Sequence, residues 1–222
     1  APALGIHRLG YAVPSLEAAL ARLRLAGAAV FPAAEVVRAG TSRRFACALD
    51  PDGSAVELVE EPGCAHAVEA RCAVVVCSDL ERAVGWYADV LGLEVRARED
   101  GTAAPGAAFG LPGDAAWDAA VLELPGRREH YALRLERWRR PAALARTPPV
   151  ANQLGAFRIA LLVDDVHAWH AELERRRVRC AGPPVWLDMG PEIPIDGLWA
   201  LLFFDPDGTC VELIQTPELR AA

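Results

Sequence analysis

The sequence predicts an α+β fold built from three copies of one module, in which a strand and a helix are followed by three strands (βαβββ). Two observations support this prediction. One segment with a strand–turn–strand pattern occurs twice with nearly the same residues, at 50–59 and at 205–214. Each module also opens with an apolar strand that leads into a capped helix. Because an internal repeat marks a repeated structural unit, we expect the module to account for nearly the whole chain.

The repeated segment reads DPDGSAVELV at 50–59 and DPDGTCVELI at 205–214. Proline at the second turn position and glycine at the fourth are typical of a type I turn, so each copy is expected to form a β-hairpin. In the outgoing strands a glutamate, Glu57 or Glu212, stands among apolar neighbours. A carboxylate in such surroundings must be paired, protonated or bound to a ligand.

The first module begins with a strand at 6–13. Pro14 and Ser15 then open a helix with leucines at helical spacing, which Gly27 closes. Three further strands are expected, at 29–31, 44–49 and 55–59.

The second and third modules repeat this order. Their helices follow the caps Ser78-Asp79 and Asp164-Asp165. In the second module we expect strands at 73–77, 93–97, 119–124 and 131–135, with a loop at 99–114. In the third we expect strands at 157–163 and near 179–180, a long loop at 183–197 and a hairpin at 199–214. The segment 139–153, which contains proline and arginine, is expected to be a linker.

Composition narrows the function classes. The chain has 222 residues, 53% of them hydrophobic, and a net charge of −7, which favours a globular protein and argues against nucleic acid or an anionic membrane as partner. We find no charged-then-apolar leader and no apolar run long enough to span a membrane. The six cysteines form no CxxC pair, so we expect reduced thiols and a cytoplasmic location. No glycine loop that could cradle a phosphate is present, and no cofactor is expected.

The segment SDLERAVGWYADVLGLEV at 78–95, together with the repeated DPDG..VEL, resembles the vicinal oxygen chelate superfamily. That superfamily includes glyoxalase I, bleomycin-resistance proteins and extradiol dioxygenases. The resemblance implies that two modules pair into a curved, open-barrel mixed sheet around a cavity. It also implies metal-ligand positions on the cavity face, one on each first strand and one on each fourth strand.

Carried onto this chain, the first-strand positions fall on Arg8, Cys72 and Arg158, and the fourth-strand positions fall on Glu57, Arg134 and Glu212. We predict that residues 67–222 form one complete paired domain and that residues 1–66 form a lone module. Since guanidinium groups cannot ligate a divalent cation, no metal is expected in the paired domain. His7 lies beside a ligand position and is expected to face away from the cavity.

Three hypotheses follow for the cavity between the second and third modules. The first is metal-independent binding of a small, aromatic or oxyanion-bearing molecule, with Cys72, Trp186, Met189 and Trp199 as further contacts and the loop 186–197 as a lid. The second is an internal ion-pair cluster without chemistry. The third is a lyase, isomerase or cyclase that uses Glu212 as general base, with Arg134 and Arg158 stabilising an oxyanion.

The lone module also predicts an association. A lone module exposes an apolar sheet face and an unpaired strand edge, both of which are unfavourable in water. Pairing with the same module of a second chain would cover them, so the sequence predicts a homodimer through residues 1–66.

Overall fold

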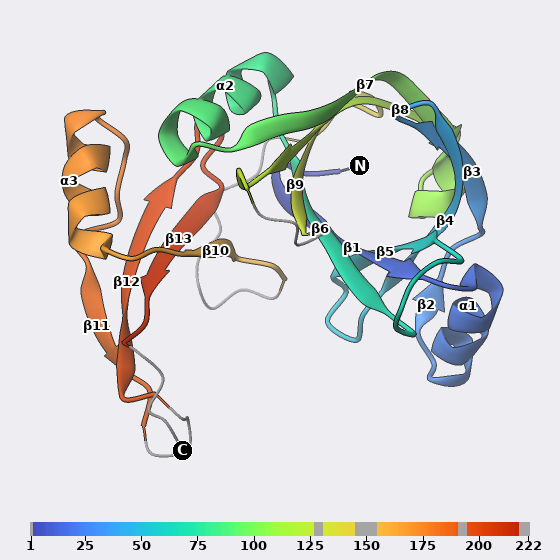
Figure 1. Ribbon diagram of the computed structural model, residues 1–222. Coiled ribbons are helices and arrows are strands. Elements are labelled where there is room, and N and C mark those ends of the chain that lie inside the picture. Colours follow the sequence, from blue (N-terminus) through green and yellow to red (C-terminus); the bar gives the residue numbers. More distant parts are fainter. Residues whose placement is uncertain (1, 127–130, 145–154, 191–194, 218–222) are drawn as a thin grey trace. The chain divides into compact units, whose positions relative to one another are not determined.

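The computed structural model describes residues 2–126, 131–144, 155–190 and 195–217. Its contacts divide the chain into unit 1, Ala1–Ala156, and unit 2, Phe157–Ala222 (Figure 1). The α+β fold of repeated βαβββ modules is confirmed: unit 1 holds the first two modules and unit 2 holds the third.

Unit 1 contains β1 (Gly5–Val13), α1 (Leu16–Leu25), β2 (Ala29–Val30), β3 (Ala34–Arg38), β4 (Thr41–Leu49) and β5 (Ala55–Glu60) from the first module. The second module adds β6 (Glu69–Val76), α2 (Leu80–Leu91), β7 (Glu94–Pro105), the short 3-10 helix η1 (Gly106–Phe109), β8 (Asp114–Glu123) and β9 (Ala132–Arg140). Unit 2 contains β10 (Arg158–Leu162), α3 (Val166–Arg175), β11 (Val185–Asp188), β12 (Gly197–Phe204) and β13 (Cys210–Gln215).

The sheet of unit 1 has nine strands in the order β2-β4-β5-β1-β6-β9-β8-β7, with β3 also paired to β4. The two modules join where β1 lies antiparallel to β6. β3 approaches β7, so the two ends of the sheet meet and the sheet curls into a barrel (Figure 1).

The helices begin as the sequence predicts. Ser15 caps α1 by accepting a hydrogen bond from the Ala18 amide, and Asp79 caps α2 by accepting one from the Arg82 amide. α2 ends at Gly92 in the left-handed conformation that glycine tolerates best (φ 69°). The buried side of α1 packs on the outer face of the sheet, so the inner face of the barrel is left for polar and aromatic groups.

The segment 99–114, which the sequence assigned to a loop, contributes both to the wall and to the interior of the barrel. The structure instead extends β7 to Pro105 and adds η1. Phe109 of η1 lies inside the barrel, with its ring centre 5.5 Å from that of Trp117 and 5.2 Å from that of Trp138. Burial of these aromatic rings explains why a segment rich in glycine and alanine becomes ordered here.

Unit 2 is an open sheet of four strands in the order β10-β13-β12-β11. α3 covers one face through Val166 and Leu173. The expected lid at 186–197 has a different structure: β11 pairs with β12 as a hairpin, in which Trp186 stands opposite Trp199. Residues 191–194 of that segment lie outside the described residues.

The pairing of modules differs from the sequence prediction. That prediction joined the second module to the third within 67–222 and left 1–66 alone, whereas the structure joins the first module to the second. β6 has β1 on one edge and β9 on the other, so neither edge of β6 remains for β10. The exposed edge that motivated a homodimer through 1–66 is therefore occupied within the chain.

No helix in the described part of the chain combines the length and the apolar character that a membrane span requires.

Candidate functional site

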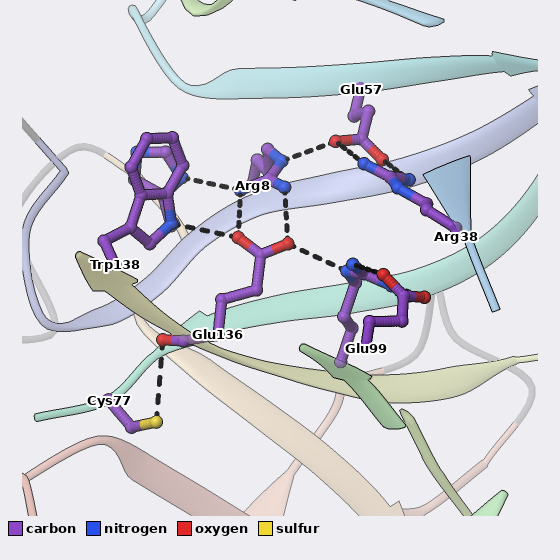
Figure 2. Close-up of polar contacts among 9 residues, drawn as sticks. Arg8, Arg38, Glu57, Cys77, Glu99, Glu136 and Trp138 are labelled. Atoms are coloured by element: carbon purple, nitrogen blue, oxygen red, sulfur yellow. Dashed lines mark hydrogen bonds and ion pairs between the residues drawn. The ribbon is translucent and has the colours of Figure 1, made fainter. Parts of the chain in front are cut away.

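Six charged side chains meet inside the barrel of unit 1, and we call them the arginine–glutamate cluster (Figure 2). Its members are Arg8 of β1, Arg38 of β3, Glu57 of β5, Glu99 of β7, and Arg134 and Glu136 of β9. Three guanidinium groups face three carboxylates, so the cluster carries no net charge when every member is ionised.

Arg8 is the centre of the cluster. Its Nε donates to Glu57 Oε2 at 2.9 Å, and its Nη1 and Nη2 donate to the two oxygens of Glu136 at 2.9 and 2.8 Å. The Arg8 side chain has no exposed surface, and a bidentate guanidinium–carboxylate pair is the strongest geometry for such a contact. Arg8 therefore ties the first module to the second across the β1–β6 seam.

The other two arginines each make a bidentate pair. Arg38 donates to both oxygens of Glu57 at 2.6 and 3.0 Å. Arg134 donates to both oxygens of Glu99 at 2.9 and 2.6 Å, and its Nε donates to Glu136 at 2.8 Å. In the described part of the chain, Arg38 Nε is the one buried side-chain atom of the cluster without a hydrogen-bond partner.

The pairing outweighs the cost of burial for the carboxylates. Burial alone would raise the pKa of Glu136, but Arg8 and Arg134 lower that pKa to about 2. Burial likewise opposes ionisation of Glu57, but Arg38 and Arg8 hold its pKa well below the usual range. Glu57 and Glu136 therefore stay ionised at neutral pH and cannot serve as proton acceptors without first losing a partner.

These side chains do not suit a metal ion. In unit 1 the four positions that correspond to the family's metal ligands hold Arg8, Cys72, Glu57 and Arg134. The two guanidinium groups have no lone pair to donate and would repel a cation. Burial raises the pKa of the Cys72 thiol to about 11, so this residue is not a ready thiolate ligand. Among the described residues, no group of three or more His, Cys, Asp and Glu side chains could hold a metal.

His7 lies at the cluster, contrary to the expectation that it faces away. The pairing of β1 with β6 shifts by one residue between Ile6 and Arg8, so His7 is the extra residue of a β-bulge. Its Nδ1 lies 3.1 Å from Arg8 Nη1. Burial and the Arg8 charge lower the pKa of His7 to about 4, so the ring is neutral at pH 7. Since arginine can only donate, His7 Nδ1 accepts and the ring proton belongs on Nε2.

A cavity of about 660 Å³ opens beside the cluster, entirely within unit 1. Its apolar wall includes Ile6, Leu9, Phe31, Leu49, Phe109 and Leu111. Its polar wall includes His7, Arg8, Asp50, Asp52 and Ser54. The volume and the mixture of apolar walls with a few polar groups are typical of small-molecule sites. A second, more apolar cavity of about 500 Å³ lies between α1 and the outer sheet face, with Tyr11, Ala18 and Leu58 among its walls.

The site residues that the sequence placed together belong to two units. Cys72 and Arg134 lie in unit 1, where Cys72 borders Gly10 and Arg134 belongs to the cluster. In unit 2, Arg158 Nε donates to Glu212 Oε2 at 2.5 Å, on the sheet face opposite α3. The expected cluster of Glu212 with both arginines is therefore formed within neither unit.

The proposed aromatic contacts lie on the other face of unit 2. Leu202 is the direct partner of Glu212, so Trp199, three residues away on β12, points to the opposite face. Trp199 packs edge-on against His167 of α3, with ring centres 4.7 Å apart, and its cross-strand partner Trp186 is 5.6 Å away. Met189 is half-buried just beyond β11. The tryptophans therefore belong to the helix-covered side rather than to the face of Glu212.

Four residues in or beside the arginine–glutamate cluster were not predicted from the sequence to lie there: His7, Arg38, Glu99 and Glu136. A signal for Glu136 was present, because it lies two residues after Arg134 and so shares its strand face. Arg38 and Glu99 come from β3 and β7, which meet only when the barrel closes, so nothing local marks them.

Comparisons with known proteins agree with this architecture. The family model described as the Glyoxalase/Bleomycin resistance protein/Dioxygenase superfamily matches residues 65–213. That match spans the second and third modules, which lie in different units of the structure. No curated protein was found to be similar in sequence.

Three solved structures illustrate the fold. Glyoxalase I from Zea mays is 19% identical, with a TM-score of 0.64 over 95% of this chain and 67% of that chain. A putative dioxygenase from Bacillus subtilis is 15% identical, with a TM-score of 0.59 over 96% of this chain and 62% of that chain. A glyoxalase family protein from Bacillus cereus is 19% identical, with a TM-score of 0.50 over 64% of this chain and 90% of that chain. At these identities the likeness shows the fold alone.

Proposed function

The chain belongs to the Glyoxalase/Bleomycin resistance protein/Dioxygenase superfamily, and we propose that it binds a small, neutral aromatic molecule in the cavity of unit 1 without a metal ion. One observation supports this most directly. A cavity of about 660 Å³ adjoins a buried charge cluster whose arginines and glutamates neutralise one another. The polar centre that would otherwise hold a metal is thus occupied by side chains, while the neighbouring space suits a ligand.

The charges around the cavity favour a neutral ligand over an anion. Arg8 is the arginine among the residues that line the cavity, but its side chain has no exposed surface, and its Nε, Nη1 and Nη2 all donate to Glu57 or Glu136. An anionic ligand would have to displace a buried carboxylate to gain those donors, and each displacement costs several kcal/mol. Asp50 and Asp52 add negative charge to the same wall. Of the aromatic or oxyanion-bearing molecules expected from the sequence, neutral aromatic ones therefore suit this cavity best.

The apolar wall favours an aromatic ligand. Phe31 and Phe109 both line the cavity, and aromatic rings gain from packing edge-to-face or offset against other rings. His7, neutral at pH 7, also lines the cavity and can offer its Nε2 proton to one hydrogen-bond acceptor of the ligand. A flat ring with one polar substituent matches both walls.

The contacts of Arg134 and Glu212 do not favour the lyase, isomerase or cyclase hypothesis. It required Arg134 to stabilise an oxyanion, but the Nε, Nη1 and Nη2 of Arg134 already donate to Glu99 and Glu136. It also required Glu212 as general base, and Glu212 accepts a hydrogen bond from Arg158 at 2.5 Å. Neither residue is poised for chemistry as the hypothesis demanded.

Fluorescent probes test the site and the ligand class together. N-phenyl-1-naphthylamine is a neutral aromatic probe, and anilinonaphthalene sulfonate is an anionic one of similar shape. We expect chelator-treated protein to bind the neutral probe more tightly than the anionic one. The variant Ala55→Trp, which fills the cavity, should abolish tight binding of the neutral probe. The variant Ala18→Trp fills the second cavity beside α1 and is the matched control, which should bind as the unchanged protein does.

Two results would count against the proposal. If Ala18→Trp abolished binding and Ala55→Trp did not, the ligand site would be the cavity beside α1. If the anionic probe bound more tightly than the neutral one, the charge argument would be wrong. Circular dichroism of both variants shows whether each substitution has preserved the fold.

A further inference from the structure

We propose that unit 2 pairs with unit 2 of a second copy of this chain through the free edge of β10, forming a second barrel whose centre contains Arg158 and Glu212 from both copies. A residue-by-residue equivalence between the two units supports this pairing.

The strand pairs β1–β5 and β10–β13 are built in the same way. In unit 1, Gly10 lies opposite Glu57 in a parallel pair; in unit 2, Ala160 lies opposite Glu212 in a parallel pair. Two residues earlier on the first strand, Arg8 bonds Glu57 just as Arg158 bonds Glu212. β10 is thus the counterpart of β1.

The difference lies at the other edge of this first strand. β1 pairs there with β6, whereas β10 is the last strand of its sheet, and none of the described residues pairs with its second edge. An unpaired strand edge presents backbone donors and acceptors that another strand can satisfy. In unit 1 that role is filled by the first strand of another module, so the structure itself supplies the template for the partner of β10.

Exposed leucine side chains lie on the sheet face of unit 2 that carries Glu212, and they favour contact of this face with a partner. Leu162 is 68% exposed, whereas its counterpart in unit 1, Ala12, has no exposure. Leu187 is 41% exposed, whereas its counterpart Val36 is 2% exposed. Both leucines lie on the same sheet face as Glu212. Burying them against a second module would remove their apolar surface from water, which favours association.

A second copy is the partner that the register favours. In unit 1, Arg8 lies opposite Val74 and Gly10 lies opposite Cys72, so the β1–β6 seam is symmetric about the pair Leu9 and Ala73. Such a seam is what two identical strands form about a two-fold axis. Applied to two copies of β10, it places the two Ile159 residues opposite each other on the axis.

The barrel formed by two copies of unit 2 would also contain four polar positions at its centre, as unit 1 does. Unit 2 alone supplies a first-strand and a fourth-strand position, Arg158 and Glu212, whereas unit 1 has four such positions. Two copies supply two arginines and two glutamates, a set that is again neutral. The Arg158 side chain, 46% exposed in the single chain, would become buried over this centre.

Cross-linking at the axis tests both the dimer and its register. We expect the unchanged protein to have a mass by light scattering twice the 23.8 kDa of one chain. In the variant Ile159→Cys, the two new thiols face each other across an antiparallel pair, with Cβ atoms about 5 Å apart, and dibromobimane should join them. The control Leu161→Cys lies on the same strand face, but its two thiols would be about 13 Å apart at ~3.3 Å per residue, too far to join.

The outcomes are decisive. A doubled mass together with cross-linking of Ile159→Cys, above the background of the unchanged protein and absent from Leu161→Cys, supports the proposal. A monomer at micromolar concentration overturns it. A dimer in which Ile159→Cys does not cross-link, or in which Leu161→Cys does so equally well, also overturns it, because the copies then meet elsewhere.

Discussion

Replacing Arg8 with methionine tests the energetic role of the arginine–glutamate cluster. The substitution keeps much of the apolar length of the side chain but removes three charge-assisted hydrogen bonds, one to Glu57 and two to Glu136. It also leaves one uncompensated negative charge in the barrel. Removing one member of a buried ion pair costs about 3–5 kcal/mol. Since whole domains are stable by about 5–15 kcal/mol, Arg8→Met should lower the free energy of unfolding of unit 1 by a large fraction.

The structure also predicts partial recovery when a second residue is replaced. Removing Arg8 together with the charge of Glu136 leaves two intact bidentate pairs, Arg38 with Glu57 and Arg134 with Glu99. In Glu136→Gln the amide oxygen can still accept from Trp138 Nε1. The double variant should therefore cost less than the sum of the two single variants, by about 1–3 kcal/mol.

Urea unfolding, followed by tryptophan fluorescence, measures these free energies. The exposed pair on α3 supplies the control: Arg175 is 69% exposed and bonds Glu172, so Arg175→Met should leave the free energy of unfolding nearly unchanged. If Arg8→Met cost less than about 1 kcal/mol, or if the double variant cost as much as the sum of its parts, the cluster would not be the coupled unit described here.

Three further predictions follow from unit 1. The lowered pKa values of Glu57 and Glu136 mean that the unfolded chain binds protons more readily than the folded chain. The stabilisation from these two carboxylates should therefore be fully present above about pH 5 and should decrease as the pH falls from 4.5 towards about 2. A urea midpoint that stays constant over this range would contradict the assignment. Gly10→Ala should destabilise by about 1–3 kcal/mol, because the added Cβ would meet Cys72 Sγ at 2.5 Å, and Cys72→Ala in the same chain should relieve much of that loss in urea unfolding. Cys47 is buried and burial raises the pKa of its thiol to about 12, so iodoacetamide should modify it only after unfolding, as mass spectrometry of the native and unfolded protein can show.

Local signals in the sequence were enough to predict the module and most of its elements, but not β3. The repeated DPDG turn, the Ser15 and Asp79 caps and the alternation around Glu57 are short-range patterns, and each stabilises the structure that it predicts. The resemblance to the family also placed Arg8 and Glu57 on the first and fourth strands of one module, where the structure pairs them. The full length of β7 and the hairpin that β11 forms could not be predicted from local signals, because their segments contain glycine and proline and become ordered through tertiary contacts.

The choice of module partners depended on longer-range geometry. The turn at 50–53 resembles the turn at 205–208, but this repeat does not specify which modules pair. The structure shows that the connector 61–68 carries the chain past the end of β1 and returns it antiparallel on the open edge of that strand. Once β1 and β6 pair, Arg38 and Glu99 reach the centre from strands that meet across the closed barrel. No spacing within the sequence marks that meeting.

The affinity of unit 1 for N-phenyl-1-naphthylamine, before and after removal of metal, tests the central claim most directly. The dissociation constant is measured by fluorescence for protein as purified, for the same protein dialysed against a chelator, and after zinc is added back. Because Arg8 and Arg134 neutralise the glutamates at the barrel centre, the three constants should agree within about twofold, a difference of about 0.4 kcal/mol. Loss of binding on chelation, restored by zinc, would show that the site needs a metal and would contradict the account.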